Sequence, residues 1–505
     1  MQIADCRLQN VRRIGLQPRE SRCRAGLWPL NATSVRSALC ALRSALCILL
    51  VGCTVGPDFQ RPKAEAPEAW EGTHLTSPGQ PSIAAPQPIE VAEWWRLLND
   101  PKLTSLVKDA VEANLDLKQA EARLREVRAA YGVATAGFWP SLSASAAYQR
   151  GQGSGARGGP HDLFSTGLDA AWELDIFGGT RRGIEAAGAD IQAAVEDRRD
   201  VLVTLAGEVA LNYVNLRGFQ QRIRIAQETL QAQRHSADLT RQRFNAGLAS
   251  GLDVANADAE VATTESQIPT LETGARQSLY ALSVLLARPP AALVSEFSTP
   301  GPVPTTPPQA PVGLPSELLR RRPDIRRSEA QIHAATARIG VAKADLFPKF
   351  SLTGSGGYGS DKLSTLIRSR NFFWSAGPTV DWQLFGAGRV QSNIELQKAL
   401  QEQTVIAYQQ TVLTAFQEVE NALVAFAMEQ RRRQWLDQAV TLERKAAALS
   451  MQLYTEGQTD FLNVLTAQRS LYASEDALVQ SHQAVAADLI ALYKALGGGW
   501  EIERR

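Results

Sequence analysis

Four segments of the chain alternate between apolar and polar residues at every second position, which predicts amphipathic strands. These predicted strands cover residues 139–150, 162–176, 348–359 and 371–385. Each is long enough to cross a bilayer when tilted, and aromatic residues lie near the strand ends, as in the girdles of membrane barrels. Strands of soluble sandwiches also alternate, but the length and the aromatic residues favour a membrane barrel.

Between and after these strands the apolar residues take up helical spacing over very long stretches. After Phe177 no proline occurs until Pro269, and the intervening apolar residues follow a 3,4 spacing, which is typical of a coiled-coil seam. The seam contains Leu202, Leu205, Val209, Asn212, Leu216, Phe219 and Ile223, of which only Asn212 is polar. The predicted helix reaches to about Phe244 and would be about 100 Å long. A second one runs from about Gly386 to Tyr454. Such helices must pack side by side as a tube or bundle.

The second half of the chain repeats the first after about 208 residues. Matching pairs are 138–140 and 346–348, 177–178 and 385–386, 243–247 and 453–457, and 252–254 and 462–464. Each half predicts a helix, two strands, a very long helix, a tight turn and another helix. We therefore predict a tandem duplication over 93–288 and 316–497, joined by a Pro-rich linker at 289–315 and followed by a tail at 498–505.

Four strands are too few to close a barrel, because small closed barrels need about eight. An open edge in lipid would leave backbone groups unpaired, at prohibitive cost. The chain must therefore oligomerise to complete its barrel. The strand count alone allows a dimer with eight strands or a trimer with twelve.

The N-terminus carries the pattern of a bacterial export signal. Arg36 and Arg43 precede the apolar run 45–52, and Cys53 follows. The run 50–53 (Leu-Val-Gly-Cys) resembles a lipobox, which implies cleavage of residues 1–52 and lipid on the thiol and amine of Cys53. Thr54 in place of Asp implies sorting to the outer membrane. The alternative is a plain signal peptide in which the cysteine occurs by chance.

Residues 1–34 are longer than such a signal needs, so we expect translation to begin downstream, at a non-AUG codon near Val35. Residues 54–91 are rich in Pro, Ala, Glu and Gln and predict an extended surface tether within a lipid-anchored segment at 53–92.

Cysteine, charge and motifs exclude several other classes of protein. All five cysteines lie at or before Cys53, so the body has no disulfide framework and no CxxC metal site. Residues 1–52 hold eight Arg and two acidic residues, which leaves 45 basic and 50 acidic residues in a body that gives no reason to expect nucleic acid. No HExxH, GxSxG or GxxxxGK[ST] motif is present, so we predict no enzyme.

Several blocks together resemble outer-membrane factors of the TolC-like family, in the multidrug (RND-type) efflux lipoprotein branch. They are the run 53–62 (Cys-Thr-Val-Gly-Pro-Asp-Phe-Gln-Arg-Pro), Trp94-Trp95 with Asp100-Pro101, the run 314–325, Phe347-Pro348 before 351–354, and the run 467–471. The resemblance covers about residues 53–497.

This resemblance implies a mainly α fold with a small membrane β-barrel. Three copies would form a twelve-stranded barrel on a long α-helical tunnel through the periplasm. It also implies docking, through a periplasmic adaptor (membrane fusion) protein, with an inner-membrane RND-type pump. Drugs or other small molecules would pass outward passively, without a cofactor. The alternative is the exit duct of a type I protein secretion system, but the lipobox and the block 321–324 (Arg-Arg-Pro-Asp) favour efflux.

The candidate functional residues lie at the two helix turns and on the polar strand faces. The resemblance implies that the turns at 244–253 and 454–463 narrow the tunnel and meet the adaptor. The candidates there are Asp460, Asp253, Asn463, Gly247, Gly457 and Arg243. Either aspartate could instead be a solvated turn residue or a helix N-cap, and Arg243 could pair with a tip acid or be solvated. The candidate residues of the barrel lumen are Asp169, Glu173, Asp175 and Asp381.

Overall fold

The computed structural model describes residues 54–75, 83–85, 92–152, 160–307 and 309–501. The predicted signal sequence and Cys53 lie outside these residues. The description below concerns the unit that begins at Cys53.

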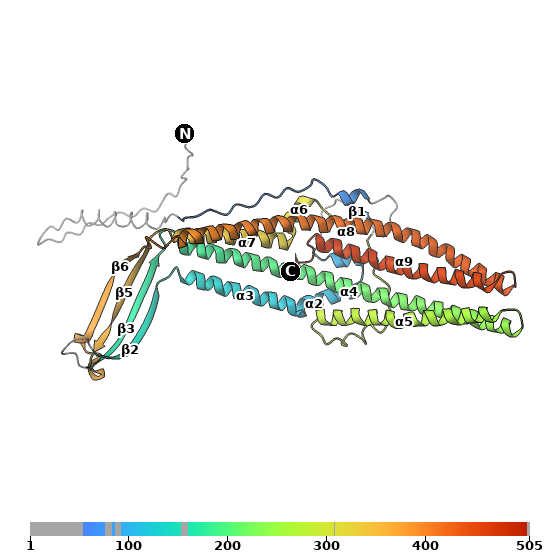
Figure 1. Cartoon of the computed structure of the whole chain (residues 1–505), viewed down its shortest axis with the longest axis horizontal. Coiled ribbons are helices and arrows are strands. Elements are labelled where there is room, and N and C mark those ends of the chain that lie inside the picture. The colour runs from blue at the N-terminus through green and yellow to red at the C-terminus, as the bar shows by residue number, and fades with distance from the viewer. Residues whose placement is uncertain (1–53, 76–82, 86–91, 153–159, 308, 502–505) are drawn as a thin grey trace, which may run out of the picture. The chain divides into compact units, whose positions relative to one another are not determined.

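Two helical hairpins of equal size form about half of this unit (Figure 1). In the first, α4 (Gly179–Asn245, 67 residues) packs along α5 (Gly251–Leu285, 35 residues). In the second, α8 (Arg389–Thr455, 67 residues) packs along α9 (Phe461–Ala495, 35 residues). The equal lengths of corresponding helices follow the sequence duplication.

Shorter helices precede the strands in each half. They are α2 (Pro101–Ala113) and α3 (Leu115–Ala136) in the first half, and α6 (Pro315–Arg321) and α7 (Pro323–Ala344) in the second. Asp100 begins α2 as its N-cap, because its carboxylate accepts hydrogen bonds from the backbone N–H groups of Lys102 and Leu103 at 2.8 and 3.1 Å. Both α3 and α7 pack on α4, so helices of the two halves lie together.

The strands form one antiparallel sheet in the order β2-β3-β5-β6. The strands are β2 (Ser141–Gln152), β3 (Pro160–Leu174), β5 (Lys349–Ser360) and β6 (Phe372–Asp381). Pairing of β3 with β5 joins the two halves, and β2 and β6 are the edges. The strand β6 ends four residues before the predicted limit, and Trp382 after it instead donates a hydrogen bond to the Leu346 carbonyl at 3.1 Å.

A second, very small sheet was not predicted. Its strands β1 (Ile83–Ala85) and β4 (Gln309–Pro311) pair in parallel, and β4 lies inside the predicted Pro-rich linker. Short strands of this kind leave too weak a periodic pattern to be recognised in the sequence.

The main hydrophobic core lies where the short helices meet the long ones. Its largest fully buried side chains include Trp70, Trp94, Tyr213, Phe426 and Tyr493. The rings of Trp94 and Tyr493 stack at 5.6 Å, which joins the start of the first half to the end of the second.

Residues 54–75, the first part of the predicted surface tether at 54–91, are extended but packed against the helices. Trp70 is only 2% exposed and donates a hydrogen bond to the Gly313 carbonyl at 3.2 Å. The ring of Phe59 stacks on His333 at 4.5 Å, and Arg61 pairs with Glu329 at 2.8 Å. Burial of Trp70 and partial burial of Phe59 offset the entropy cost of ordering a Pro-rich chain, and composition alone does not indicate this.

We expect Trp70→Ala to detach this segment, because truncating a buried tryptophan costs about 3–5 kcal/mol. Limited proteolysis of the purified protein should then cut residues 54–75 faster than in the wild type. Glu68→Ala, at an exposed position of the same segment, is the control and should leave the cleavage rate unchanged. Equal cleavage of wild type and Trp70→Ala would contradict the packing role of Trp70.

Candidate functional site

The sheet has two chemically different faces, which the strand register defines. Directly paired residues share a face, so Leu142 with Ala170, Trp172 with Leu352, and Phe350 with Val380 belong to one apolar surface. Its large side chains are exposed; Trp374, for example, is 73% accessible. A continuous exposed apolar surface of this kind fits contact with lipid and does not fit contact with water.

Aromatic residues border the apolar face at both ends of the strands. Toward the β5–β6 connection, Tyr148 packs on Phe164 at 4.8 Å and Tyr358 on Phe372 at 5.4 Å. At the helical end, Trp172 donates to the Phe138 carbonyl at 3.1 Å, and Trp382 makes the same bond in the second half. Such rings lie at the interfaces of a membrane, so the two rows mark the limits of a bilayer-spanning band.

The opposite face of the sheet is lined with hydroxyl groups and acids. Ser351 lies opposite Thr379, and Ser355 shares a hydrogen bond with Ser375 at 2.7 Å. Among the predicted lumen acids, Asp169 accepts a hydrogen bond from Ser145 at 3.4 Å, and Asp381 lies opposite Lys349. Glu173 shares this face, since it lies opposite Ser351.

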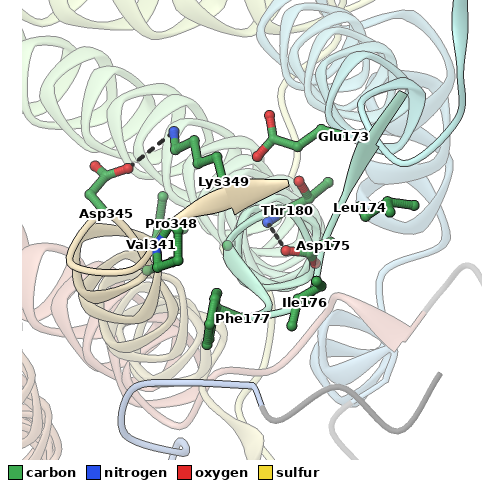
Figure 2. Close-up of a pocket in the computed structure, with 12 residues that line it drawn as sticks. Glu173, Leu174, Asp175, Ile176, Phe177, Thr180, Val341, Asp345, Pro348 and Lys349 are labelled. Carbon is green, nitrogen blue, oxygen red and sulfur yellow. Dashed lines mark hydrogen bonds and ion pairs between the residues drawn. The ribbon is translucent and has the colours of Figure 1, made fainter. Parts of the chain in front are cut away.

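Asp175, the fourth predicted lumen acid, belongs to the start of α4. Its carboxylate accepts hydrogen bonds from the backbone N–H groups of Thr180 at 3.1 Å and Arg181 at 2.8 Å, and it pairs with the Arg181 side chain. Figure 2 shows it beside Thr180 in the turn between β3 and α4. Its side chain is 8% exposed, so it anchors the junction and does not extend along the polar face.

A polar recess of about 260 Å³ lies at this junction (Figure 2). Glu173, Asp175 and Asp345 line it together with Lys349, whose ammonium pairs with Asp345 at 3.2 Å. Within the part of the chain that the structure describes, no group of three or more His, Cys, Asp or Glu side chains could hold a metal ion. Among the described helices, none contains an apolar stretch long enough to span a membrane.

The two helix turns have the same geometry. Gly247 and Gly457 both take φ of +75°, a left-handed conformation that glycine adopts without strain. The backbone N–H of Gly247 donates a hydrogen bond to the Phe244 carbonyl at 2.9 Å. The N–H of Gly457 donates one to the Tyr454 carbonyl at 3.0 Å. Each long helix therefore ends in the same tight reversal.

Both tip aspartates, Asp253 and Asp460, cap the N-terminus of a helix. Asp253 forms a capping box with Ser250: its N–H donates to the Ser250 hydroxyl at 3.2 Å, and its carboxylate accepts from the Ser250 N–H at 2.9 Å. Asp460 is the N-cap of α9 and accepts from the Asn463 N–H at 3.2 Å. The Asn463 amide also donates to Thr459 at 2.8 Å. Asp460 nevertheless stays exposed and available to further groups.

Arg243 joins the two turns through Tyr454, and not through a tip acid or as a purely solvated side chain. It donates a hydrogen bond to the Tyr454 carbonyl at 2.5 Å, and its guanidinium lies 4.6 Å from the centre of the Tyr454 ring. The Tyr454 hydroxyl in turn donates to Thr240 at 3.3 Å. Farther along the hairpins, Glu260 of α5 pairs with Arg469 of α9 at 2.5 Å. The sequence pattern gave no signal for these contacts, because the partners lie more than 200 residues apart.

Comparison with known proteins identifies strong similarity over nearly the whole body. The model of the family described as "Outer membrane efflux protein" matches residues 106–288 and 314–498. The chain is 33% identical over 472 residues to the pyoverdine export outer membrane protein OpmQ of Pseudomonas aeruginosa, covering 91% of this chain and 96% of that protein. It is 31% identical over 469 residues to the cation efflux system protein CusC of Escherichia coli K12, covering 90% and 97%.

A solved structure is similar too. The outer-membrane channel OprN superposes with a TM-score of 0.83 at 36% identity, covering 89% of this chain and all of that one.

We expect Asp253→Ala to destabilise the start of α5 by about 1 kcal/mol, because it removes the carboxylate that accepts hydrogen bonds from Ser250 in the capping box. Hydrogen exchange of the amides at 250–254 should become faster by the factor that this loss of free energy implies. Asp253→Asn should recover most of the protection against exchange. Glu272→Ala, at an exposed position of the same helix, is the matched control. Unchanged exchange in Asp253→Ala would contradict the capping role.

Burial, together with the neighbouring charge of Glu429, raises the pKa of Asp488 on α9 to about 6. The ionised carboxyl therefore lowers the stability of the fold, and this loss develops as the pH rises from about 4 to 6. We expect Asp488→Asn to raise the thermal transition at pH 7.5 and to leave it nearly unchanged at pH 4. Differential scanning calorimetry checks this, with Glu272→Gln as control; an equal gain at both pH values would exclude the titration of Asp488.

Proposed function

The chain belongs to the outer membrane efflux protein family and is an outer-membrane efflux channel, and from this premise we propose how its subunits build the pore. Three copies join β6 of one subunit to β2 of the next and close a twelve-stranded barrel. The observation that carries this proposal is the two-faced sheet, which has an apolar outer surface and whose edge strands β2 and β6 each pair on one side only among the residues that the structure describes. The helical hairpins would then line a tunnel into the periplasm.

The polar face of the sheet would line the pore, and solutes would cross it without chemical change. Asp169, Glu173 and Asp381 are our candidates for lumen residues, since each belongs to the face opposite the aromatic rows. The names of OpmQ and CusC refer to pyoverdine export and to cation efflux, which supports a small solute as cargo. The alternative cargo, a protein as in a type I secretion duct, is named by neither of these two relatives.

The pore needs an energy source, because a passive duct conducts in either direction. We infer that an inner-membrane RND-type pump supplies it through a periplasmic adaptor that contacts the helix turns. Lipid on Cys53 would add an anchor: Val55 donates a hydrogen bond to the Phe177 carbonyl at 3.1 Å, so the chain following Cys53 is held at the junction of strand and helix.

The helix turns are the proposed gate. In a trimer each turn residue occurs three times around the axis, so an exposed acid such as Asp460 would form a ring of negative charge. Asp253, Asn463, Gly247 and Gly457 would shape this ring, and Arg243 would fix one turn to the other.

We expect the purified protein to conduct ions in a planar bilayer and Asp460→Ala to reduce its cation preference about twofold or more, because three carboxylates leave the narrow end. Single-channel recording with Glu272→Ala as the control measures this. Unchanged conductance and selectivity would remove Asp460 from the gate. A non-conducting monomer in the wild-type preparation would contradict the trimeric pore itself.

A further inference from the structure

The connection between β5 and β6 carries unpaired positive charge. Residues 361–371 contain Lys362, Arg368 and Arg370 against a single acid, Asp361. All three cationic side chains are exposed, and none forms an ion pair with any residue that the structure describes. This contrasts with the long helices, where arginines such as Arg222 and Arg241 are paired with carboxylates.

The same connection presents two bare aliphatic side chains. Leu363 is 67% exposed and Ile367 is 78% exposed, among the highest values of the described aliphatic residues. Leu363 directly follows Lys362 and Ile367 directly precedes Arg368, so apolar and positive groups share one short segment. An aliphatic residue beside a cation is typical of segments that lie in the interface of a membrane.

The segment is held by its own hydrogen bonds. Ser360 and Thr365 share a hydroxyl hydrogen bond at 2.6 Å, and the Asn371 amide donates to the Thr365 carbonyl at 2.6 Å. Two 3₁₀ turns, η3 (Leu363–Thr365) and η4 (Ser369–Asn371), are fixed in this way. These hydrogen bonds order the backbone that carries the cations before any ligand binds. This order lowers the entropy cost of binding.

The position of the segment at the ends of β5 and β6 indicates which layer of the membrane it contacts. It joins the ends of β5 and β6 between Tyr358 and Phe372, the aromatic pair that borders the lipid-facing band. The other ends of the strands lead into the long helices, which the proposed function places in the periplasm. The segment therefore lies at the level of the outer-leaflet headgroups, an inference that rests on the proposed barrel.

We propose that residues 361–371 bind a phosphorylated lipid of the outer leaflet. Arg368 and Arg370 offer planar forks that match phosphate oxygens, and Lys362 adds a third positive charge. Leu363 and Ile367 insert among the acyl chains beside the headgroup. A fold of the same segment inward over the pore would instead expose both aliphatic side chains to water, beside a polar lumen that gives them no apolar contact.

The test measures lipid binding to the full-length trimer in nanodiscs of phosphatidylcholine that contain diphosphoryl lipid A. Each cation near an anionic surface contributes about fivefold to binding, so the triple variant K362Q/R368Q/R370Q should bind roughly a hundredfold more weakly. Its matched control, K108Q/R276Q/K445Q, removes three exposed charges from the helices and should bind as the wild type does. Native mass spectrometry counts the retained lipid.

Two further arms separate headgroup from acyl recognition. The variant L363S/I367S should bind the intact lipid more weakly and keep its affinity for the deacylated phosphorylated disaccharide. Enzymatically dephosphorylated lipid A should bind no more tightly to the wild type than to the triple cation variant. Equal binding of phosphorylated and dephosphorylated lipid would overturn the proposal.

Single-channel recording of the same preparations distinguishes this inference from the proposed function. If the triple variant keeps its lipid but changes ion selectivity, the segment lies over the pore and the lipid site is wrong. If the wild type does not conduct at all, the proposed pore is wrong instead. If the variant conducts normally and loses the lipid, both stand.

Discussion

Backbone hydrogen bonding in a medium without water is the constraint on which the rest of this structure depends. A strand edge in lipid has no solvent to satisfy its N–H and C=O groups. A sheet of four strands with edges at β2 and β6 must therefore pair with the strands of other subunits. The apolar outer face, the aromatic rows and the oligomeric pore all follow from this single requirement. The acids and hydroxyls of the other face are tolerable only because closure of the barrel turns that face toward water.

The two halves of the chain are joined by contacts that neither half could make alone. At the sheet, β3 pairs with β5 over eleven residue pairs. In the helical region Arg222 of α4 forms a two-pronged ion pair with Asp476 of α9, at 2.6 and 3.1 Å. At the turns Tyr454 reaches Thr240. Contacts at the sheet, along the long helices and at the turns therefore hold the duplicated halves together as one unit.

Local periodicity is what the sequence predicted well, and distant contacts are what it did not. The strand faces and the long helices could be predicted because each depends on neighbours two, three or four residues away. The glycine turns were readable because a tight reversal needs a left-handed residue. Asp175 looked like a strand acid by alternation alone, since nothing local shows that Arg181 and the start of α4 use its carboxylate. The contacts of Arg243 and Trp70 were not predicted for the same reason: their partners, Tyr454 and Gly313, are more than 200 residues away.

The matched lengths of the two hairpins limit how such a chain can change. Corresponding helices have 67 and 35 residues in both halves, and their ends meet in one small apolar cluster that includes Ala257 and Val464. One extra residue in a single helix would advance its end by about 1.5 Å and rotate it by about 100°. Insertions and deletions should therefore survive in the helical region only when both halves acquire them together or when they come in whole turns, so that the tandem copies remain in register.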